Sequence, residues 1–330
     1  MNPADRTLIE SLARQTMIYP FKVWGFGEGI ALEAVWEAAD ALGEDSYRRF
    51  VLDLFQRWLA RPIAEPDHSA PGMLLLDAYE ATGDARYLER AHELAKHMLA
   101  LPHDDATGAA FHRPQHPDYH DYLYVDCMEV DAPFLCKLGK VTGDDAFTGA
   151  GVAQMLGYCA LLQDDETGLF YHQYDRATGQ VNGAFWGRGN GWALLGMLKT
   201  LRLLPDSDPA HAAIMARFVQ LVSALDCWQR PDGTWSTVIN ATETYRECSL
   251  PAMFGAGIGL GIRYGLLDAS FAPVVERAWR ATSKRITDGL LRDVSIATPP
   301  GDAAHYDQIA TGSGYPWGQG PALLFALMQG

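Results

Sequence analysis

The sequence predicts an all-helical (α/α)6 barrel, in which six inner helices are surrounded by outer helices. Three observations predict this fold. A helix–turn–helix phrase recurs along the chain, the first helix of each pair is apolar all round, and the second carries charge on one face. A helix that is apolar all round is buried, whereas an amphipathic helix turns one face to solvent. The chain is therefore expected to wrap one ring of helices around another.

The recurring phrase joins the end of one helix to the start of the next. It reads ADALGEDSYRRF, YEATGDARYLER and GKVTGDDAFTGA around Gly43, Gly83 and Gly143, with a degenerate copy, RYGLLDASFAPV, near Gly265. Glycine favours the left-handed conformation that ends a helix, and an acidic residue or serine suits the start of the next one. Each copy therefore predicts a closely connected pair of helices.

The expected inner helices share an unusually apolar, often glycine-rich composition. They span residues 30–41, 72–81, 133–141, 192–204, 252–264 and 322–328, and residues 1–16 supply the remaining outer helix. We expect one catalytic domain over residues 1–330. Two segments, GLFYHQYD and GTWSTVIN, have the composition of short hairpins within loops.

Charge and composition limit the possible partners. The 330 residues are 48% hydrophobic with a mean hydropathy of −0.10, which is typical of a globular protein with a large core. The formal net charge of −15 would repel nucleic acid, anionic membranes and long anionic polysaccharides. An anionic substrate should therefore be short and bound by a local site, and the sequence gives no indication of oligomeric state.

The sequence lacks convincing signals for secretion, membrane spanning, metal binding or nucleotide binding. The N-terminus lacks a signal peptide, no apolar run is long enough to span a membrane, and the five cysteines form no CxxC pair, so we expect a cytoplasmic protein with reduced core cysteines. His112, His116 and His120 share one loop but lack a convincing set of metal ligands. The stretch GAGIGLGIRYG resembles a nucleotide-binding loop without the preceding strand. We expect no metal and no cofactor.

Candidate site residues gather where the inner helices begin. The converging N-termini of these helices carry partial positive charge that favours an anion. The same end of the barrel should hold polar and aromatic side chains, namely Trp24, Phe26, Asp67, His68, Asp126, Trp186, Arg188, Asn190, Trp192 and Trp317.

Two aspartates are the candidates for proton transfer. Asp131 is better spaced than Asp126 to cap a helix that begins at Pro133, which leaves Asp126 free for catalysis. Asp67 has a rival cap in Ser69, so capping and catalysis are equally open for it. Two carboxylates at one mouth would raise the pKa of one of them, while the helix N-termini act in the opposite direction.

The run WGRGNGW, residues 186–192, is the most specific short motif. Its alternating glycines let a backbone approach a ligand closely, Arg188 suits a carboxylate, and tryptophan faces suit a sugar ring. A tight loop with two core tryptophans is the structural alternative. His172, in GLFYHQYD, would ordinarily be a surface or packing residue.

Together, WGFGEGIAL, DHSAPGMLLLDAYEATGD, YVDCMEVDAPFL, FYHQYD, WGRGNGW and ECSLPAMFGAGIGLGIRYGLLD resemble the unsaturated rhamnogalacturonyl hydrolases of glycoside hydrolase family 105. The unsaturated glucuronyl hydrolases of family 88 are related to them. The resemblance implies an (α/α)6 barrel, with Asp126 as acid/base and Asp67 as a second essential aspartate. It places His172, Trp186 and Arg188 in the subsite for an unsaturated uronate, and Phe26 where the family has a tyrosine.

The implied reaction is hydration of a vinyl ether. Asp126 protonates C4 of a 4,5-unsaturated uronic acid, and its carboxylate then deprotonates a water that adds at C5. The resulting hemiketal opens and releases the neighbouring sugar. The run at residues 247–251 and the C-terminal WGQGPALLF depart from the family pattern, which leaves the sugar and its linkage open.

Three alternatives remain. The first is an unsaturated glucuronyl hydrolase acting on other uronate disaccharides. The second is a sugar 2-epimerase on the same barrel, which would need paired histidines at the helix mouths, where only His68 lies. The third is a non-enzymatic helical scaffold, which predicts exposed apolar patches that the charged outer helices do not provide.

Overall fold

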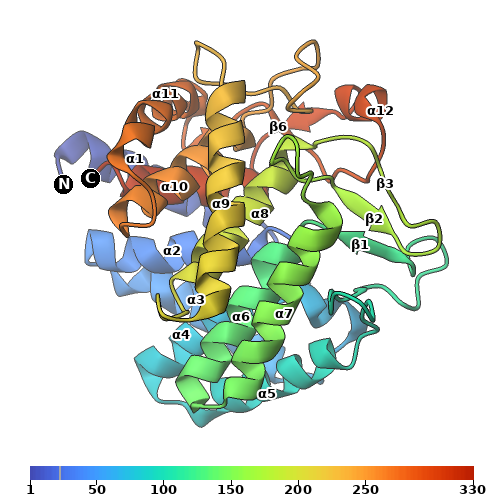
Figure 1. The fold of residues 1–330 in the computed structure, drawn as a ribbon. Coiled ribbons are helices and arrows are strands. Elements are labelled where there is room, and N and C mark those ends of the chain that lie inside the picture. Colours follow the sequence, from blue (N-terminus) through green and yellow to red (C-terminus); the bar gives the residue numbers. More distant parts are fainter. Residues whose placement is uncertain (22–23) are drawn as a thin grey trace.

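The computed structural model describes residues 1–21 and 24–330 and confirms the (α/α)6 barrel. Each inner helix contacts the next one along the ring, and the last contacts the first, which closes the barrel (Figure 1). The inner helices are α2 (Glu28–Leu42), α4 (Gly72–Thr82), α6 (Cys127–Thr142), α8 (Gly187–Leu201), α10 (Ser249–Arg263) and α13 (Pro316–Leu327).

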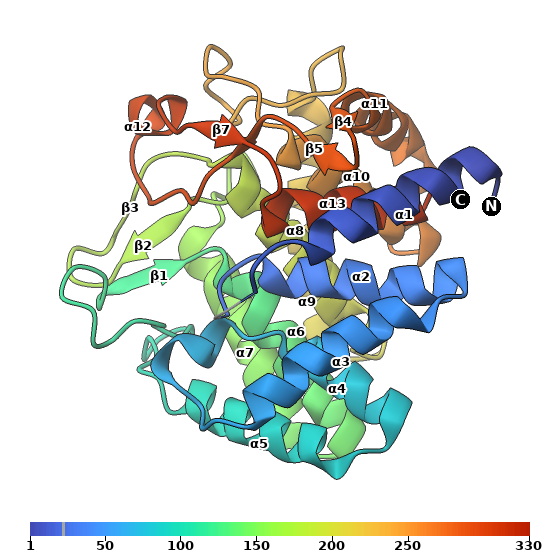
Figure 2. The same ribbon diagram turned by 180° about the vertical axis from the view of Figure 1, so that it is seen from behind.

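Each inner helix is covered by an outer partner. The outer helices are α1 (Pro3–Met17), α3 (Asp45–Leu59), α5 (Ala85–Leu99), α7 (Asp145–Leu162), α9 (Pro209–Trp228) and α11 (Ala272–Ser283). The N-terminal helix α1 packs on α13 and so completes the outer ring, as the sequence predicts (Figure 2). The turn glycines Gly43, Gly83 and Gly143 end α2, α4 and α6 with φ of 70°, 69° and 72°.

Three inner helices begin at least five residues earlier than the sequence predicts. Helix α6 starts at Cys127 with Pro133 inside it, α8 starts at Gly187, and α13 starts at Pro316. Asp131 is therefore not a helix cap. It lies buried within α6 and accepts a hydrogen bond from Tyr158 Oη. Proline and glycine predict helix boundaries at these positions, but a buried helix tolerates both residues when its packing compensates for their cost.

Short strands lie in the loops that lead into the inner helices. Strands β1 (Tyr122–Tyr124), β2 (Gln173–Asp175) and β3 (Gln180–Val181) form one antiparallel sheet. Two further pairs are β4 (Ile286–Thr287) with β5 (Leu290–Leu291), and β6 (Val294–Ser295) with β7 (Thr311–Gly312). The segment GLFYHQYD supplies β2, whereas GTWSTVIN makes only isolated bridges, such as that of Val238 with Trp186. Between β6 and β7 lies the short helix α12 (Ala303–Asp307).

Two expectations from composition can be compared with the structure. None of the described helices is long and apolar enough to cross a membrane. All five cysteines are unpaired, but only Cys127, Cys136, Cys159 and Cys248 are buried, and Cys227 is exposed.

Candidate active site

A cavity of about 380 Å³ opens where the inner helices begin. Most of the predicted site residues line it, namely Phe26, Asp126, His172, Trp186, Arg188, Trp192 and Trp317. Trp24, Asp67, His68 and Asn190 are not part of its lining. The sequence therefore located the mouth correctly, but it did not separate the residues that face the cavity from those that support it.

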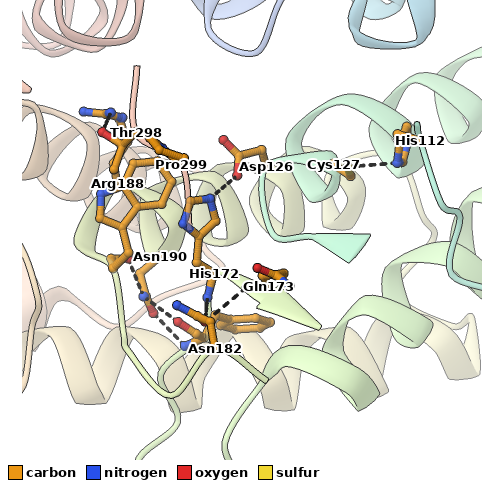
Figure 3. Close-up of polar contacts among 12 residues, drawn as sticks. His112, Asp126, Cys127, His172, Gln173, Asn182, Arg188, Asn190, Thr298 and Pro299 are labelled. Atoms are coloured by element: carbon orange, nitrogen blue, oxygen red, sulfur yellow. Dashed lines mark hydrogen bonds and ion pairs between the residues drawn. The ribbon is translucent and has the colours of Figure 1, made fainter. Parts of the chain in front are cut away.

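Asp126 and His172 are brought together by the small sheet. Strands β1 and β2 pair with Tyr124 opposite Gln173, and the Val125 amide donates to the His172 carbonyl oxygen over 3.0 Å. Asp126 follows directly, at the start of α6, where its side chain caps no backbone amide. Its Oδ2 lies 3.4 Å from His172 Nε2 (Figure 3). Asp126 is thus a buried carboxyl group whose closest ionisable neighbour is an imidazole.

The tautomer of His172 follows from its other contact. The Tyr306 hydroxyl accepts hydrogen bonds from Asn182 Nδ2 (3.0 Å) and from the Gly301 amide (3.2 Å). A hydroxyl has one hydrogen and two lone pairs, so this hydrogen is left for His172 Nδ1, 2.8 Å away. His172 Nδ1 is therefore an acceptor, and in the neutral ring the proton is on Nε2, facing Asp126.

Burial keeps the imidazole neutral. It lowers the pKa of His172, and the neighbouring Asp126 only partly opposes this effect. The ring stacks on Trp186 with centroids 4.1 Å apart, and Trp186 lies parallel to Tyr306. The site thus holds one neutral N–H donor against one oxygen of Asp126.

Both terminal nitrogens of the Arg188 guanidinium are engaged by the protein. Its terminal nitrogens donate to the Ser295 carbonyl and hydroxyl oxygens, to the Ile296 carbonyl oxygen (2.9 Å) and to Thr298 Oγ1 (2.8 Å). Glu247 lies 3.6 Å away, and the side chain is buried. Arg188 therefore holds the rim segment 295–298 with its terminal nitrogens, and it also lines the cavity.

The first turn of α8 also differs from its expected role. A Cβ at Gly187 would lie 2.5 Å from Leu250 Cδ1, and one at Gly189 would lie 2.7 Å from Val125 Cγ1. These glycines permit helix packing rather than the approach of a ligand to the backbone. Asn190 donates to and accepts from the Phe170 backbone at 2.9 and 2.8 Å, so it ties the segment leading to His172 to α8.

Asp67 lies outside the cavity, in a 3-10 helix that spans Glu65–Ser69. Both of its carboxylate oxygens pair with Arg61 at 2.7 Å, and Oδ2 also accepts from Trp58 Nε1 and the Ala64 amide. Although burial acts to raise it, the pKa of Asp67 is lowered by Arg61 and these donors. This carboxylate is thus a saturated acceptor at the outer side of the mouth.

The two remaining predicted residues, Trp24 and His68, do not line the cavity but pack against other aromatic residues. Trp24 is buried, with its ring edge-on to Phe55 and Trp58. His68 packs beside Phe26 and donates from Nδ1 to the Glu65 carbonyl oxygen over 3.0 Å. His68 Nδ1 is the donor because a carbonyl oxygen can only accept.

The expected absence of a histidine metal site can be examined at the loop itself. His112 is buried, and His116 and His120 do not join it in any cluster of potential ligands within the described ranges. His112 instead lies 2.9 Å from Cys127 Sγ through Nδ1 and 2.8 Å from Asp131 through Nε2. With Cys127 and Asp131, His112 forms a buried group of three potential metal ligands, whose ligand atoms all lie within 4.8 Å of one another.

The cavity also contains residues that the sequence analysis missed. Glu28, Arg113, Tyr119, Tyr124 and residues 297–300 line it. Burial raises the pKa of Glu28, and its Oε2 has no hydrogen-bond donor within the part of the chain described. Arg113 lies in a loop and Tyr306 in the short helix α12, and neither belongs to a motif, so only the tertiary structure reveals them. Glu28 is part of WGFGEGIAL and could have been noticed as an acid in the first turn of an inner helix.

Comparisons with known proteins are consistent with this geometry. The profile of Glycosyl Hydrolase Family 88 matches residues 4–328. This chain belongs to that family. It is a glycoside hydrolase, and its barrel is the fold of the family's solved members.

Among curated proteins, this chain is similar to the unsaturated rhamnogalacturonyl hydrolase YesR of Bacillus subtilis, which is 28% identical and aligns over 97% of this chain and 93% of its own length. A solved structure of a possible GH105 family member from Salmonella enterica has a TM-score of 0.90 at 23% identity, covering 98% of this chain and 93% of that one. The unsaturated glucuronyl hydrolase of Bacillus sp. GL1 has a TM-score of 0.74 at 16% identity, covering 98% and 94%.

Proposed function

We propose that this family 88 hydrolase releases the terminal 4,5-unsaturated uronic acid from short oligosaccharides that lyases produce. The name and full-length alignment of YesR favour a rhamnogalacturonan-type substrate, and an unsaturated glucuronyl disaccharide is the second candidate. The tryptophans in the lining, Trp186, Trp192 and Trp317, provide apolar faces for a sugar ring. In this proposal residues 1–330 act as one cytoplasmic catalytic domain without metal or cofactor, and neither nucleic acid nor a membrane is a partner.

The geometry of Asp126 carries the proposal. The Nε2–H of neutral His172 faces Oδ2, which leaves Oδ1 to carry a proton, deliver it and later accept one. Protonation of C4 converts the vinyl ether into an oxocarbenium ion at C5. Asp126, now a carboxylate, removes a proton from the water that attacks C5, and the hemiketal opens to release the aglycone. One carboxyl group that acts first as acid and then as base is sufficient.

Other features of the described site agree with this assignment. A conventional glycosidase needs two facing carboxyl groups at the anomeric carbon. Asp67 lies outside the cavity lining and pairs with Arg61 through both of its oxygens, so we assign it a positioning role. A 2-epimerase would need a pair of imidazoles, and His172 is the only histidine among the described lining residues.

Reaction in deuterated water tests the proposal. Hydration places one solvent deuterium on C4 and solvent oxygen on C5, whereas displacement at C1 leaves C4 untouched. We expect loss of the near-ultraviolet absorbance of the conjugated alkene and deuterium at C4 in early NMR spectra of the product. Saturated uronides should react very slowly, because only the enol ether makes C4 basic.

The Asp126→Asn variant is the control for this experiment. An amide has the shape of the acid but cannot donate and recover the proton, so we expect turnover to fall by about 10³-fold or more with unchanged thermal unfolding. Cleavage without deuterium at C4, or near-normal turnover by folded Asp126→Asn, would contradict the proposed mechanism.

A further inference from the structure

A buried thiol, imidazole and carboxylate lie beside the cavity, and the proposed mechanism uses none of them. Cys127, His112 and Asp131 are 0%, 1% and 0% exposed, and none of the three lines the cavity. Cys127 directly follows Asp126 in the chain, and Asp126 does line it. A role for this group in the reaction would therefore be exerted through Asp126, an inference that rests on the proposed function.

The imidazole of His112 joins the other two groups. Its Nδ1 lies 2.9 Å from Cys127 Sγ (Figure 3), and its Nε2 lies 2.8 Å from Asp131 Oδ2 in a bent contact. Cys127 and Asp131 are four residues apart in α6, so they share one face of that helix. The ring, which comes from the loop before β1, thus spans the first turn of α6.

The partners decide where the protons lie. Tyr158 Oη donates to Asp131 Oδ2, so this oxygen is an acceptor. A bare nitrogen 2.8 Å from it would be repelled, so His112 Nε2 carries the imidazole proton. Burial raises the pKa of the Cys127 thiol, which keeps its hydrogen and donates it to Nδ1. The three groups form a relay that runs from thiol to imidazole to carboxylate.

The same groups are also potential metal ligands, but the distances favour the relay. Two ligands of a tetrahedral zinc ion lie about 3.3 Å apart or more, because each is about 2.0 to 2.3 Å from the metal. The contacts of 2.9 Å to Cys127 Sγ and 2.8 Å to Asp131 Oδ2 are shorter than that. Both are hydrogen-bond distances, and the relay accounts for them without an ion.

Asp126 lies between two anchors on the backbone. On one side, the Val125 amide donates to the His172 carbonyl oxygen over 3.0 Å. On the other side, His112 holds Cys127. The Asp126 side chain caps no backbone amide of α6, so it adds no anchor of its own there. Loss of the thiol would release the second anchor and leave His112 Nδ1 buried without a partner, which is costly.

We propose that Cys127 and His112 are positioning residues that fix the first turn of α6 so that the carboxyl group of Asp126 faces C4 of the substrate. Proton transfer is sensitive to such placement, since a shift of about 1 Å can lower a rate by about a hundredfold. Substrate binding depends on the whole lining of the cavity, of which neither residue is part. Disturbing the relay should therefore lower kcat and leave KM nearly unchanged.

The test removes the thiol donor and then restores a donor at the same place. For Cys127→Ala in the full-length enzyme, acting on an unsaturated disaccharide, we expect kcat to fall by about tenfold and KM to change by less than about twofold. Cys127→Ser keeps a hydroxyl donor and should recover most of the loss. Unchanged kcat in Cys127→Ala, or no recovery in Cys127→Ser, would overturn the proposal.

Cys159→Ala is the matched control. Cys159 lies in α7 and is 1% exposed, and its thiol has no hydrogen-bond partner in the part of the chain that the structure describes. The substitution removes the same buried atom, so it should lower the midpoint of thermal unfolding about as much as Cys127→Ala does. It should leave kcat unchanged. Equal losses of kcat in the two variants would reduce the role of Cys127 to packing and contradict the proposal.

A further measurement needs no turnover and so separates the relay from the proposed function. Nitrogen-15 NMR of histidine-labelled protein shows which imidazole nitrogen is protonated, and His112→Gln assigns the signals. We expect a bare Nδ1 in the wild type, whose resonance moves in Cys127→Ala and partly returns in Cys127→Ser. A protonated Nδ1, or stoichiometric zinc that Cys127→Ala loses, would overturn the relay. Failure of the wild type to cleave any lyase product would instead refute the proposed function.

Discussion

His172 and Tyr306 lie 134 residues apart in the sequence, yet one hydroxyl hydrogen of Tyr306 decides which nitrogen of the imidazole is protonated. Two donors, Asn182 and Gly301, use the lone pairs of that hydroxyl and so direct its hydrogen at Nδ1. A positioned donor on the neutral ring favours the neutral form. Tyr306 is thus a positioning residue for the group that contacts Asp126, although it does not line the cavity itself.

Tyr306→Phe should therefore damage the proton transfer rather than substrate binding. Without the hydroxyl, Nδ1 of His172 can take a proton, so the pKa of the imidazole rises and the tautomer is no longer selected. We expect kcat to fall by about tenfold with little change in KM, and the acid limb of the pH–rate profile to move to higher pH by about half a unit to one unit. Steady-state kinetics between pH 5 and 8 measure both effects.

Tyr171→Phe is the matched control for that experiment. Tyr171 precedes His172 directly, but its hydroxyl lies 3.3 Å from Asp164, away from the imidazole. Removal of this hydroxyl should leave the pH–rate profile in place. An identical loss of kcat in both variants would indicate a general effect of hydroxyl removal and would contradict the tautomer argument.

Residue types in the sequence predicted part of this site. The acid Asp126 and the stacking partners His172 and Trp186 could be identified because they lie in specific runs, and the structure brings these three together. Arg113 could not be predicted, because its place in the cavity lining is a property of the folded surroundings. The sequence shows the charges of Asp67 and Arg188. It does not show that Arg61 pairs with Asp67, or that the rim segment 295–298 accepts hydrogen bonds from Arg188.

For the helices, the sequence predicted the order of inner and outer helices more accurately than it predicted the residues at which the helices begin. The turn glycines and acidic caps mark the outer ends of the helix pairs, because φ near +70° is a local requirement that glycine meets. The mouth ends were harder to predict. In α8 the glycines look like a loop, but Gly187 and Gly189 are needed where Leu250 and Val125 pack against the first turn. A tertiary contact explains these glycines, and no local signal reports it.

Lys199 connects three inner helices through buried charge. From α8 its ammonium contacts Glu33 of α2 at 2.5 Å and Glu129 of α6. Although burial opposes the charge, the two carboxylates raise the pKa of Lys199, so it remains an ammonium. Removing one partner of a buried ion pair is costly, because the charges that remain are left without compensation.

Lys199→Met should accordingly lower the free energy of unfolding by about 3 kcal/mol, measured by urea unfolding at pH 7.5. The double variant Lys199→Met with Glu129→Gln should recover part of the loss, because one of the stranded carboxylates is removed. Lys140→Met, on the exposed end of α6, is the control and should change stability by less than about 0.5 kcal/mol. Additive effects of the first two substitutions would show that Lys199 and Glu129 do not interact.

In the whole molecule, the helices that bury the core and the residues that form the candidate site lie in different parts of the barrel. The two rings of helices bury the core, while the loops at one end supply the sheet of β1, β2 and β3, the rim and the cavity (Figure 1). Several of the groups that form this end are buried and ionisable. Stability should therefore depend on pH, because these titratable groups are buried in the folded protein and exposed in the unfolded chain.

His68 makes that dependence measurable. Burial lowers its pKa from 6.5 to about 3, and the nearby groups His112, Arg113 and His97 act in the same direction, against one hydrogen bond to the Glu65 carbonyl oxygen. Below pH 6.5 the unfolded chain protonates this imidazole, whereas the folded protein does not until the pH approaches about 3. Stability is thus fully present above pH 6.5 and is lost as the pH falls toward 3, at about 1.4 kcal/mol per pH unit for this group.

His68→Asn should remove this contribution, because an amide nitrogen keeps the hydrogen bond to Glu65 but does not titrate. We expect the wild type to lose about 2 kcal/mol more than the variant between pH 6.5 and 5, measured by urea unfolding across that range. The exposed His92→Asn should leave the pH dependence of the wild type unchanged. Parallel stability curves for wild type and His68→Asn would mean that His68 gains its proton in the folded state as easily as in the unfolded chain, and would contradict the effect expected from its burial.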